Sequence, residues 1–288
     1  MCVVGVLSGQ NSKPKAWAKC RFALALALAL AMSLPVSLAL ALAGHDRQAL
    51  ADDAAQPDGE TIAPATPSGN TYEIWAGADA TRRTASIWSG LTWSPLGGIQ
   101  EAGWRLRGVA GGGRYTYDGW RIVGGLPRPA HFRAVTLFGD ALVGYHLQIG
   151  SLTLKPFAGL SMVEHRSLPF DPVSRINGRT VGAKVALETW WNIGSSAWLN
   201  VDGTWSQVHA TTTVRARLGY RLFGDVSAGP EATALTDTNQ EMRRAGLFIR
   251  YAWDGGEVSL SGGVSGRSWD DAARQAQPYA NVSVLGRF

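Results

Sequence analysis

Candidate catalytic side chains are scattered through the chain. Metal-binding motifs place histidines at fixed spacings such as His-x-x-x-His, and no two of the five histidines have that spacing: His45, His131, His146, His165 and His209. His146 could act with a serine, as in outer-membrane lipases and deacylases, but those sites face lipid near the outer rim. His146 is instead expected near the opposite end of its strand, where short turns connect neighbouring strands. The run Gly111–Gly113 lacks the Lys-Ser/Thr of a phosphate-binding loop. The sequence therefore predicts no catalytic residue, no metal site and no cofactor.

Charged side chains form a second candidate site, because they recur on one face of segments whose other face is apolar. Arg215, Arg217 and Arg221, for example, alternate with Val214 and Leu218. Arginine pairs bidentately with carboxylates and stays charged, so we expect these three arginines to meet Asp202, Glu231 or Glu188 on neighbouring strands. The complete predicted network comprises Arg105, Arg107, Asp140, Lys184, Glu188, Asp202, Arg215, Arg217, Arg221, Glu231 and Arg250.

The elements that carry these residues alternate with a period of two from Tyr72 onward, which is typical of β-strands. Clusters of Gly, Pro, Asn and Asp leave no room for long helices. The alternation predicts about twelve strands, over residues 72–82, 86–94, 103–117, 133–149, 152–165, 178–191, 196–207, 212–223, 226–235, 242–253, 257–267 and 279–288. Their lengths suit strands of roughly 9–11 residues that cross a bilayer at a tilt, some running longer.

Two features favour a membrane barrel over a soluble sandwich, which would alternate equally. Connections alternate in length: residues 150–151, 192–195, 224–225 and 254–256 are short, whereas 118–132, 166–177 and 268–278 are long. The turn at 95–102 departs from this pattern. Aromatic residues lie where strands meet the short-turn rim, as in an interfacial girdle: Tyr72, Trp93, Trp104, Trp191, Trp253 and Phe288.

The charged face should point inward, because an arginine or lysine facing lipid at the midplane costs about 2–4 kcal/mol. The apolar face then meets lipid, and we expect six residues to point outward: Val181, Val185, Leu187, Val214, Leu218 and Leu247. The prediction is an all-β, antiparallel, up-and-down transmembrane barrel of the bacterial outer-membrane type, with a lumen that is either plugged or open.

The N-terminal segment reads as a secretory signal. A basic region around Lys13–Arg21 precedes the uncharged Ala/Leu run of residues 22–43, and small-x-small sites predict cleavage after Ala43 or Ala51. The length of the run also fits a membrane anchor. We predict a signal peptide over residues 1–51, a disordered lead-in over 52–71 and the barrel domain over 72–288.

Charge and cysteine content exclude several classes of function. The formal net charge is +5, but residues 1–51 hold five of the 27 basic and one of the 22 acidic residues, which leaves +1 for the remainder. This balance does not support nucleic-acid binding. Cys2 and Cys20 both precede the apolar run, so a processed chain would have no disulfide or thiolate site.

Several segments resemble a known family when they are taken in order. They are Tyr-Glu-Ile-Trp-Ala-Gly at 72–77, Gly-Leu-Thr-Trp-Ser-Pro-Leu-Gly at 90–97, Gly-Trp-Arg-Leu-Arg-Gly at 103–108, Gly-Arg-Tyr-Thr-Tyr-Asp-Gly at 113–119, Leu-Lys-Pro-Phe-Ala-Gly at 154–159 and Gly-Pro-Glu at 229–231. Together they resemble the cellulose biosynthesis protein BcsS family, over roughly Tyr72–Phe288. The resemblance implies a bacterial outer-membrane or periplasmic accessory of cellulose secretion, with no catalytic residues to carry over.

Three functions follow as hypotheses. The first is a non-enzymatic outer-membrane barrel that assists export or anchoring of a β-glucan. Trp120 and Trp269 on its long loops would be sugar-stacking platforms, or else interfacial or loop-packing residues. Its expected partners are outer-membrane lipids, cellulose and other secretion components, and its N-terminus should face the periplasm. The second is a general porin, and the third is a barrel enzyme acting on lipid or acyl groups.

Overall fold

The computed structural model describes residues 69–171, 173–174, 176–238, 241–267 and 277–288. The predicted signal peptide and residues 52–68 of the predicted lead-in lie outside the described residues. Within the part of the chain that is described, no helix is long and apolar enough to cross a membrane.

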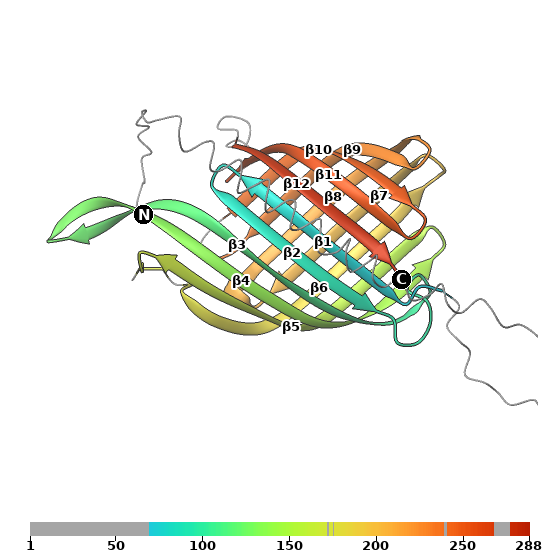
Figure 1. Ribbon diagram of the computed structural model, residues 1–288, viewed down its shortest axis with the longest axis horizontal. Helices are drawn as coiled ribbons and strands as arrows, with labels where there is room; N and C mark the ends of the chain where they lie inside the picture. The colour runs from blue at the N-terminus through green and yellow to red at the C-terminus, as the bar shows by residue number, and fades with distance from the viewer. Residues whose placement is uncertain (1–68, 172, 175, 239–240, 268–276) are drawn as a thin grey trace, which may run out of the picture.

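Twelve antiparallel strands close into one barrel, as predicted (Figure 1). Each strand pairs with the next along the chain, and β1 closes the sheet by pairing with β12. The strands are β1 (Tyr72–Thr81), β2 (Thr84–Trp93), β3 (Gly103–Val123), β4 (Leu126–Ile149), β5 (Leu152–Leu168), β6 (Gly178–Ile193), β7 (Ala197–Ser206), β8 (Thr211–Phe223), β9 (Val226–Thr236), β10 (Glu241–Trp253), β11 (Gly256–Gly266) and β12 (Gln277–Arg287). A short 3-10 turn, η2 (Val208–Ala210), connects β7 to β8.

The connection between β3 and β4 differs from the prediction. A long loop was expected over residues 118–132, but the two strands continue as a paired hairpin that turns at Gly124 and Gly125. These glycines have φ values of 62° and 79°, and a tight two-residue hairpin turn needs positive φ at both positions. In Figure 1 the tip of this hairpin projects beyond the other strands.

Two prolines in the hairpin explain why the sequence did not predict paired strands there. Pro127 and Pro129 lie in β4 opposite Ile122 and Trp120. Pairing between β4 and β5 stops at Arg133, so this stretch of β4 has β3 as its partner on one side and a free edge on the other. A free edge tolerates residues that lack an N–H group.

The two ends of the barrel have different character. The proximal rim contains both ends of the barrel domain, where Tyr72 and Phe288 exchange backbone hydrogen bonds of 2.8 Å. The distal rim lies at the opposite end. The expectation of long distal loops holds only in part, because β1 and β2 join through residues 82–83 and β3 and β4 through 124–125. Long strands extend the distal side instead: β3 has 21 residues and β4 has 24.

The outer surface is apolar at the alternate positions predicted to face outward. Five of the six residues named above are among the most exposed large apolar side chains, and Leu218 is half-buried. Exposed aromatic residues gather near the proximal rim, where Tyr72 stacks on Trp93 at 6.2 Å and Trp104 meets Tyr145 edge-on at 5.3 Å. Apolar bands bordered by aromatic residues are typical of barrels that span a lipid bilayer.

Aromatic rings on the inner surface lie over glycines of the neighbouring strand. A Cβ atom at any of these glycines would overlap the facing ring, so the absence of a side chain lets the ring pack against the barrel wall. The cross-strand pairs are Trp75–Gly90, Trp88–Gly77, Phe138–Gly111, Phe157–Gly144 and Trp198–Gly219.

Candidate functional site in the barrel lumen

An ion pair near the proximal rim joins two strands that are not neighbours in the sheet. Arg107 of β3 donates two hydrogen bonds to the carboxylate of Glu188 on β6, at 2.5 and 3.0 Å. The guanidinium also lies 3.7 Å from the centroid of the Phe157 ring on β5. Because β4 and β5 separate the two strands in the sheet, this pair ties distant parts of the wall together.

Glu231 of β9 is the centre of a second cluster. Its carboxylate accepts hydrogen bonds from Arg215 at 2.9 and 2.5 Å and from the Tyr279 hydroxyl at 3.3 Å, and Arg217 lies 3.8 Å away. The Glu231 side chain is 4% exposed, so its charge depends on these neighbours for stabilisation. The structure thus places two of the three highlighted arginines beside one of the expected carboxylates.

Two further ion pairs involve residues of the predicted network. Lys184 of β6 reaches Asp140 of β4 at 2.5 Å. Arg250 of β10 pairs with Glu257 of β11 at 2.5 Å, and its guanidinium lies 5.2 Å from the Trp190 ring centroid. Each of these two cations is therefore paired with an anion on a different strand.

Three residues of the predicted network have other surroundings. Arg221 differs from the expectation: it donates to the Ser195 carbonyl of the β6–β7 turn and, at 3.1 Å, to Asn192 of β6, and no described carboxylate forms an ion pair with it within 4.0 Å. Asp202 accepts a hydrogen bond from Asn200 at 2.9 Å, and none of the described residues forms an ion pair with it within 4.0 Å.

Arg105 holds a segment of chain instead of pairing with a carboxylate. Its guanidinium donates to the Ser94 hydroxyl at 2.8 Å and to the carbonyls of Gly98 and Ile99 at 3.0 and 3.1 Å. Arg105 and Ile99 are both buried. The connection between β2 and β3 therefore folds inward and narrows the lumen at the proximal rim.

Two ion pairs made by the first strand were not predicted from the sequence. Arg244 of β10 binds Asp79 of β1 at 2.5 and 2.9 Å, and Arg287 of β12 donates to Glu73 of β1 at 3.3 Å. The alternation of β1 contained the signal, because Glu73 and Asp79 share a face with Trp75 and Gly77. Assigning that face to the lumen would have found both acids.

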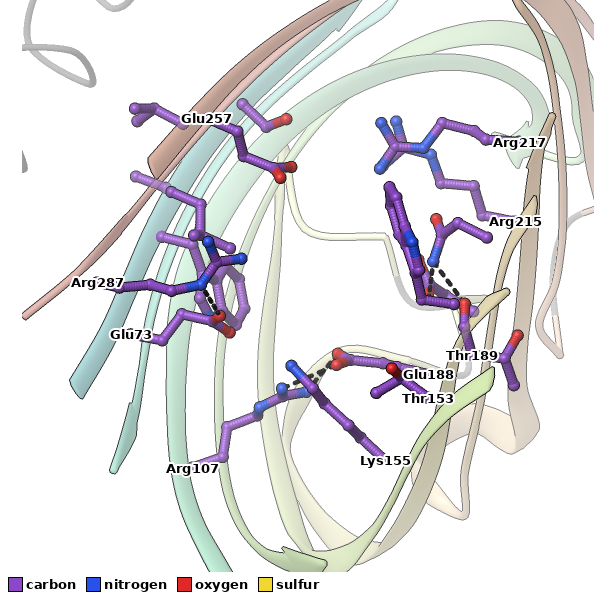
Figure 2. Close-up of a pocket in the computed structure, with 18 of the residues that line it drawn as sticks. Glu73, Arg107, Thr153, Lys155, Glu188, Thr189, Arg215, Arg217, Glu257 and Arg287 are labelled. Atoms are coloured by element: carbon purple, nitrogen blue, oxygen red, sulfur yellow. Dashed lines mark hydrogen bonds and ion pairs between the residues drawn. The ribbon is translucent and has the colours of Figure 1, made fainter. Parts of the chain in front are cut away.

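A cavity of about 310 Å³ lies in the lumen between these clusters (Figure 2). Figure 2 shows Glu73 and Arg287 on one wall, Arg215 and Arg217 on the opposite wall, and Arg107 with Glu188 between them. Three tryptophans contribute to the lining: Trp75, Trp88 and Trp190. Its charged residues are five cations and four carboxylates, namely Arg107, Lys155, Arg215, Arg217, Arg287, Glu73, Glu188, Asp202 and Glu257. Such a lining suits a polar ligand of little net charge, through stacking on aromatic faces and hydrogen bonds to hydroxyl groups.

The connection between β5 and β6 contacts the β3–β4 hairpin on the distal side of the barrel. Asp171 of this connection is buried, and it accepts hydrogen bonds from the Tyr117 hydroxyl and from Arg121 Nε, both at 2.8 Å. The hydrogen bond from Arg121 is the main cause that lowers the pKa of Asp171 below its ordinary value. The charged form of Asp171 therefore fastens this connection to the inner face of the β3–β4 hairpin.

The structure describes only one of the two tryptophans that were predicted to contact a glucan. Trp120 lies in β3 on the projecting hairpin, opposite Pro129, and not on the long loop that was expected. Its side chain is 62% exposed and shares the outer face of the hairpin with exposed Ile122. Trp269 lies outside the described residues.

Histidines make hydrogen bonds that do not assemble a hydrolytic site among the described residues. His165 bonds to Tyr115 at 2.5 Å and Thr136 at 3.0 Å, His146 lies 3.2 Å from the Ile99 carbonyl, and His131 bonds to Asp118 at 2.7 Å. No histidine in the described ranges is hydrogen-bonded to a serine hydroxyl. The same residues contain no group of three or more His, Cys, Asp or Glu side chains that could hold a metal ion.

Several solved barrels are similar in architecture. They include a monoaromatic hydrocarbon channel, the TodX deltaS2S3 mutant (TM-score 0.48, 9% identity, covering 79% of this chain and 93% of that one), and the transport unit of the autotransporter AIDA-I from Escherichia coli (0.46, 9%, 84% and 96%). A third is the KdgM porin in complex with disordered oligogalacturonate (0.44, 10%, 75% and 99%). No curated protein matches the chain.

The family is shown by the sequence of the barrel itself. A family model described as cellulose biosynthesis protein BcsS matches residues 74–288, which runs from β1 to the last residue of the chain. This match confirms the resemblance to the BcsS family that the six quoted segments indicated. The chain belongs to the BcsS family of cellulose biosynthesis proteins.

Proposed function

We propose that this chain is a non-enzymatic accessory of cellulose secretion that resides in the bacterial outer membrane and assists export or anchoring of a β-glucan. The observation that carries the proposal is the family match over residues 74–288, because it covers nearly the whole barrel and not one loop. The exposed apolar band and the proximal aromatic residues support a membrane location. The proximal rim, which holds both ends of the barrel domain, would face the periplasm.

The lumen has the chemistry that a neutral glucan requires. A cellulose chain carries no charge, so its recognition depends on aromatic faces and neutral hydrogen bonds and not on a strong electrostatic field. The cavity offers Trp75, Trp88 and Trp190 among cations and anions in nearly equal number. Trp120 adds an exposed aromatic face on the distal hairpin, where an emerging chain could stack.

A general porin is the second candidate, because the architecture is the same. The lumen argues against wide diffusion: the Arg107–Glu188 ion pair projects into it, and Arg105 holds the β2–β3 connection inside it. An enzyme acting on lipid has less support, since the described residues bring no serine hydroxyl to a histidine.

Binding of sugars to the purified barrel tests this proposal. We expect cello-oligosaccharides to bind and to quench tryptophan fluorescence, whereas carboxylated oligosaccharides of the same length bind less well. Trp75→Ala and Trp88→Ala should weaken the binding. Trp93→Ala, which removes an outward tryptophan of β2, is the matched control.

A liposome-swelling assay separates the two candidates. Swelling that depends only on solute size, with no preference for β-glucans, would support the general porin and contradict glucan handling.

A further inference from the structure

Charged side chains occupy one region of the outer barrel wall near the distal rim. Arg114 of β3, Arg133 of β4, Arg166 and Glu164 of β5 and Arg179 of β6 all lie at the alternate positions that face away from the lumen. The four arginine side chains are exposed. We call these five residues the outer arginine patch, and its net charge is +3.

The strand register brings the patch together. Arg114 and Arg166 are the cross-strand partners of Val135 on its two sides, and Arg133 lies two positions from Val135 along β4. Neighbouring strands are about 4.8 Å apart, so the Cα atoms of the three arginines lie within about 10 Å of one another.

Only two of the four arginines of the patch are hydrogen-bonded to its carboxylate. Glu164 accepts hydrogen bonds from Arg166 Nε at 2.8 Å and from Arg179 at 3.1 Å. The side chains of Arg114 and Arg133 have no hydrogen bond, ion pair or ring contact with any described residue. Two cations therefore lie side by side on the wall, and neither forms an ion pair with a residue that the structure describes.

Apolar residues adjoin the patch on the same faces of the same strands. Leu137, Leu160, Met162 and Val181 are all exposed, and each lies closer to the proximal rim than the patch arginine on its own strand. Arginine costs about 2–4 kcal/mol at the midplane of a bilayer but about 0–1 kcal/mol near its interface. The patch thus marks the depth at which the apolar band ends and lipid headgroups begin.

We propose that the outer arginine patch binds the phosphate groups of a phosphorylated glycolipid of the outer leaflet, of the lipopolysaccharide type. Guanidinium groups pair bidentately with phosphate, and the adjoining leucine, methionine and valine side chains suit the acyl chains of the same molecule. At the corresponding depth near the proximal rim the exposed side chains are aromatic, so the barrel contacts the two membrane–water interfaces with different kinds of side chain. The inference rests on the proposed orientation, in which the distal rim faces outward, and not on glucan handling.

Binding of purified lipid A to the detergent-solubilised barrel tests the inference. The variant is Arg114→Gln with Arg133→Gln, because neither side chain has a partner within the described chain to lose. Arg128→Gln with Arg221→Gln is the control, since it removes two other exposed arginines. We expect roughly 10- to 30-fold weaker binding of phosphorylated lipid A to the first variant, and nearly unchanged binding to the control.

Two further arms keep the result interpretable. Arg114→Lys with Arg133→Lys should retain most of the affinity, and dephosphorylated lipid A should bind all variants equally weakly. Equal affinity of the variant and the control for phosphorylated lipid A would overturn the inference, as would tight binding of the dephosphorylated form. Because the assay contains no glucan, its failure would leave the proposed role in cellulose secretion unaffected.

Discussion

The substitution Glu231→Gln removes the carboxylate that accepts two hydrogen bonds from Arg215 and lies 3.8 Å from Arg217. Breaking a buried ion pair from one side costs about 3–5 kcal/mol. The side chains of Arg215 and Arg217 are 23% and 11% exposed and so keep some hydration. We therefore expect the lower end, a loss of about 3 kcal/mol in the free energy of unfolding, or roughly a 100-fold change in the folding equilibrium constant.

Equilibrium unfolding in urea, followed by tryptophan fluorescence of the barrel in lipid vesicles, measures this loss. Asp118→Asn is the matched control, because its ion pair with Arg83 is exposed, with side chains 62% and 57% accessible, and should contribute less than about 1 kcal/mol. Adding Arg215→Met to Glu231→Gln should recover part of the stability, since one unpaired cation is then removed. The reasoning is refuted if Glu231→Gln destabilises the barrel no more than Asp118→Asn does.

Three further predictions concern other parts of the molecule. Gly219→Leu should lower the free energy of unfolding in urea by about 1–3 kcal/mol, because the new side chain meets the buried Trp198 ring, and an unchanged value would contradict the packing role of this glycine. Asp171→Asn should increase hydrogen–deuterium exchange in Ser167–Asp171 at pH 7. In the unmodified protein, the pKa of Asp171 is lowered, so its contribution to stability is present above its ordinary pKa of 3.8 and is lost as the pH falls through the still lower pKa of the folded state. If neither the substitution nor the fall in pH changes hydrogen–deuterium exchange in this segment, the fastening role is refuted. Trp120→Ala should weaken cello-oligosaccharide binding several-fold with the same urea midpoint, whereas the neighbouring Ile122→Ala should not; equal effects would show that the hairpin surface contributes only apolar area.

The strand pattern was predictable wherever one face is apolar and the other polar. Val214, Arg215 and Arg217 on β8 show this clearly, because the cost of placing an arginine in lipid fixes which face points inward. The hairpin tip was not predictable in the same way. Pro127 and Pro129 contradict an ordinary strand, and only the free edge of β4 makes them acceptable.

The presence of a lumen network could be predicted, but its pairing could not. Which carboxylate meets which arginine depends on the position of strands across the barrel, as in Arg107–Glu188, where two other strands intervene. Arg105 and Arg221 found carbonyl partners because connecting segments, which have no periodic pattern, fold close to them. The same limitation explains why the β2–β3 connection inside the lumen had no sequence signal.

The amount of cellulose at the cell surface tests the central claim most directly. A strain that lacks this chain should bind much less cellulose-specific dye, and the wild-type chain supplied in trans should restore the binding. Cellulose synthase activity of isolated inner membranes should stay unchanged, because an outer-membrane accessory acts after polymerisation. Undiminished surface cellulose in the deletion strain would contradict a role in cellulose secretion.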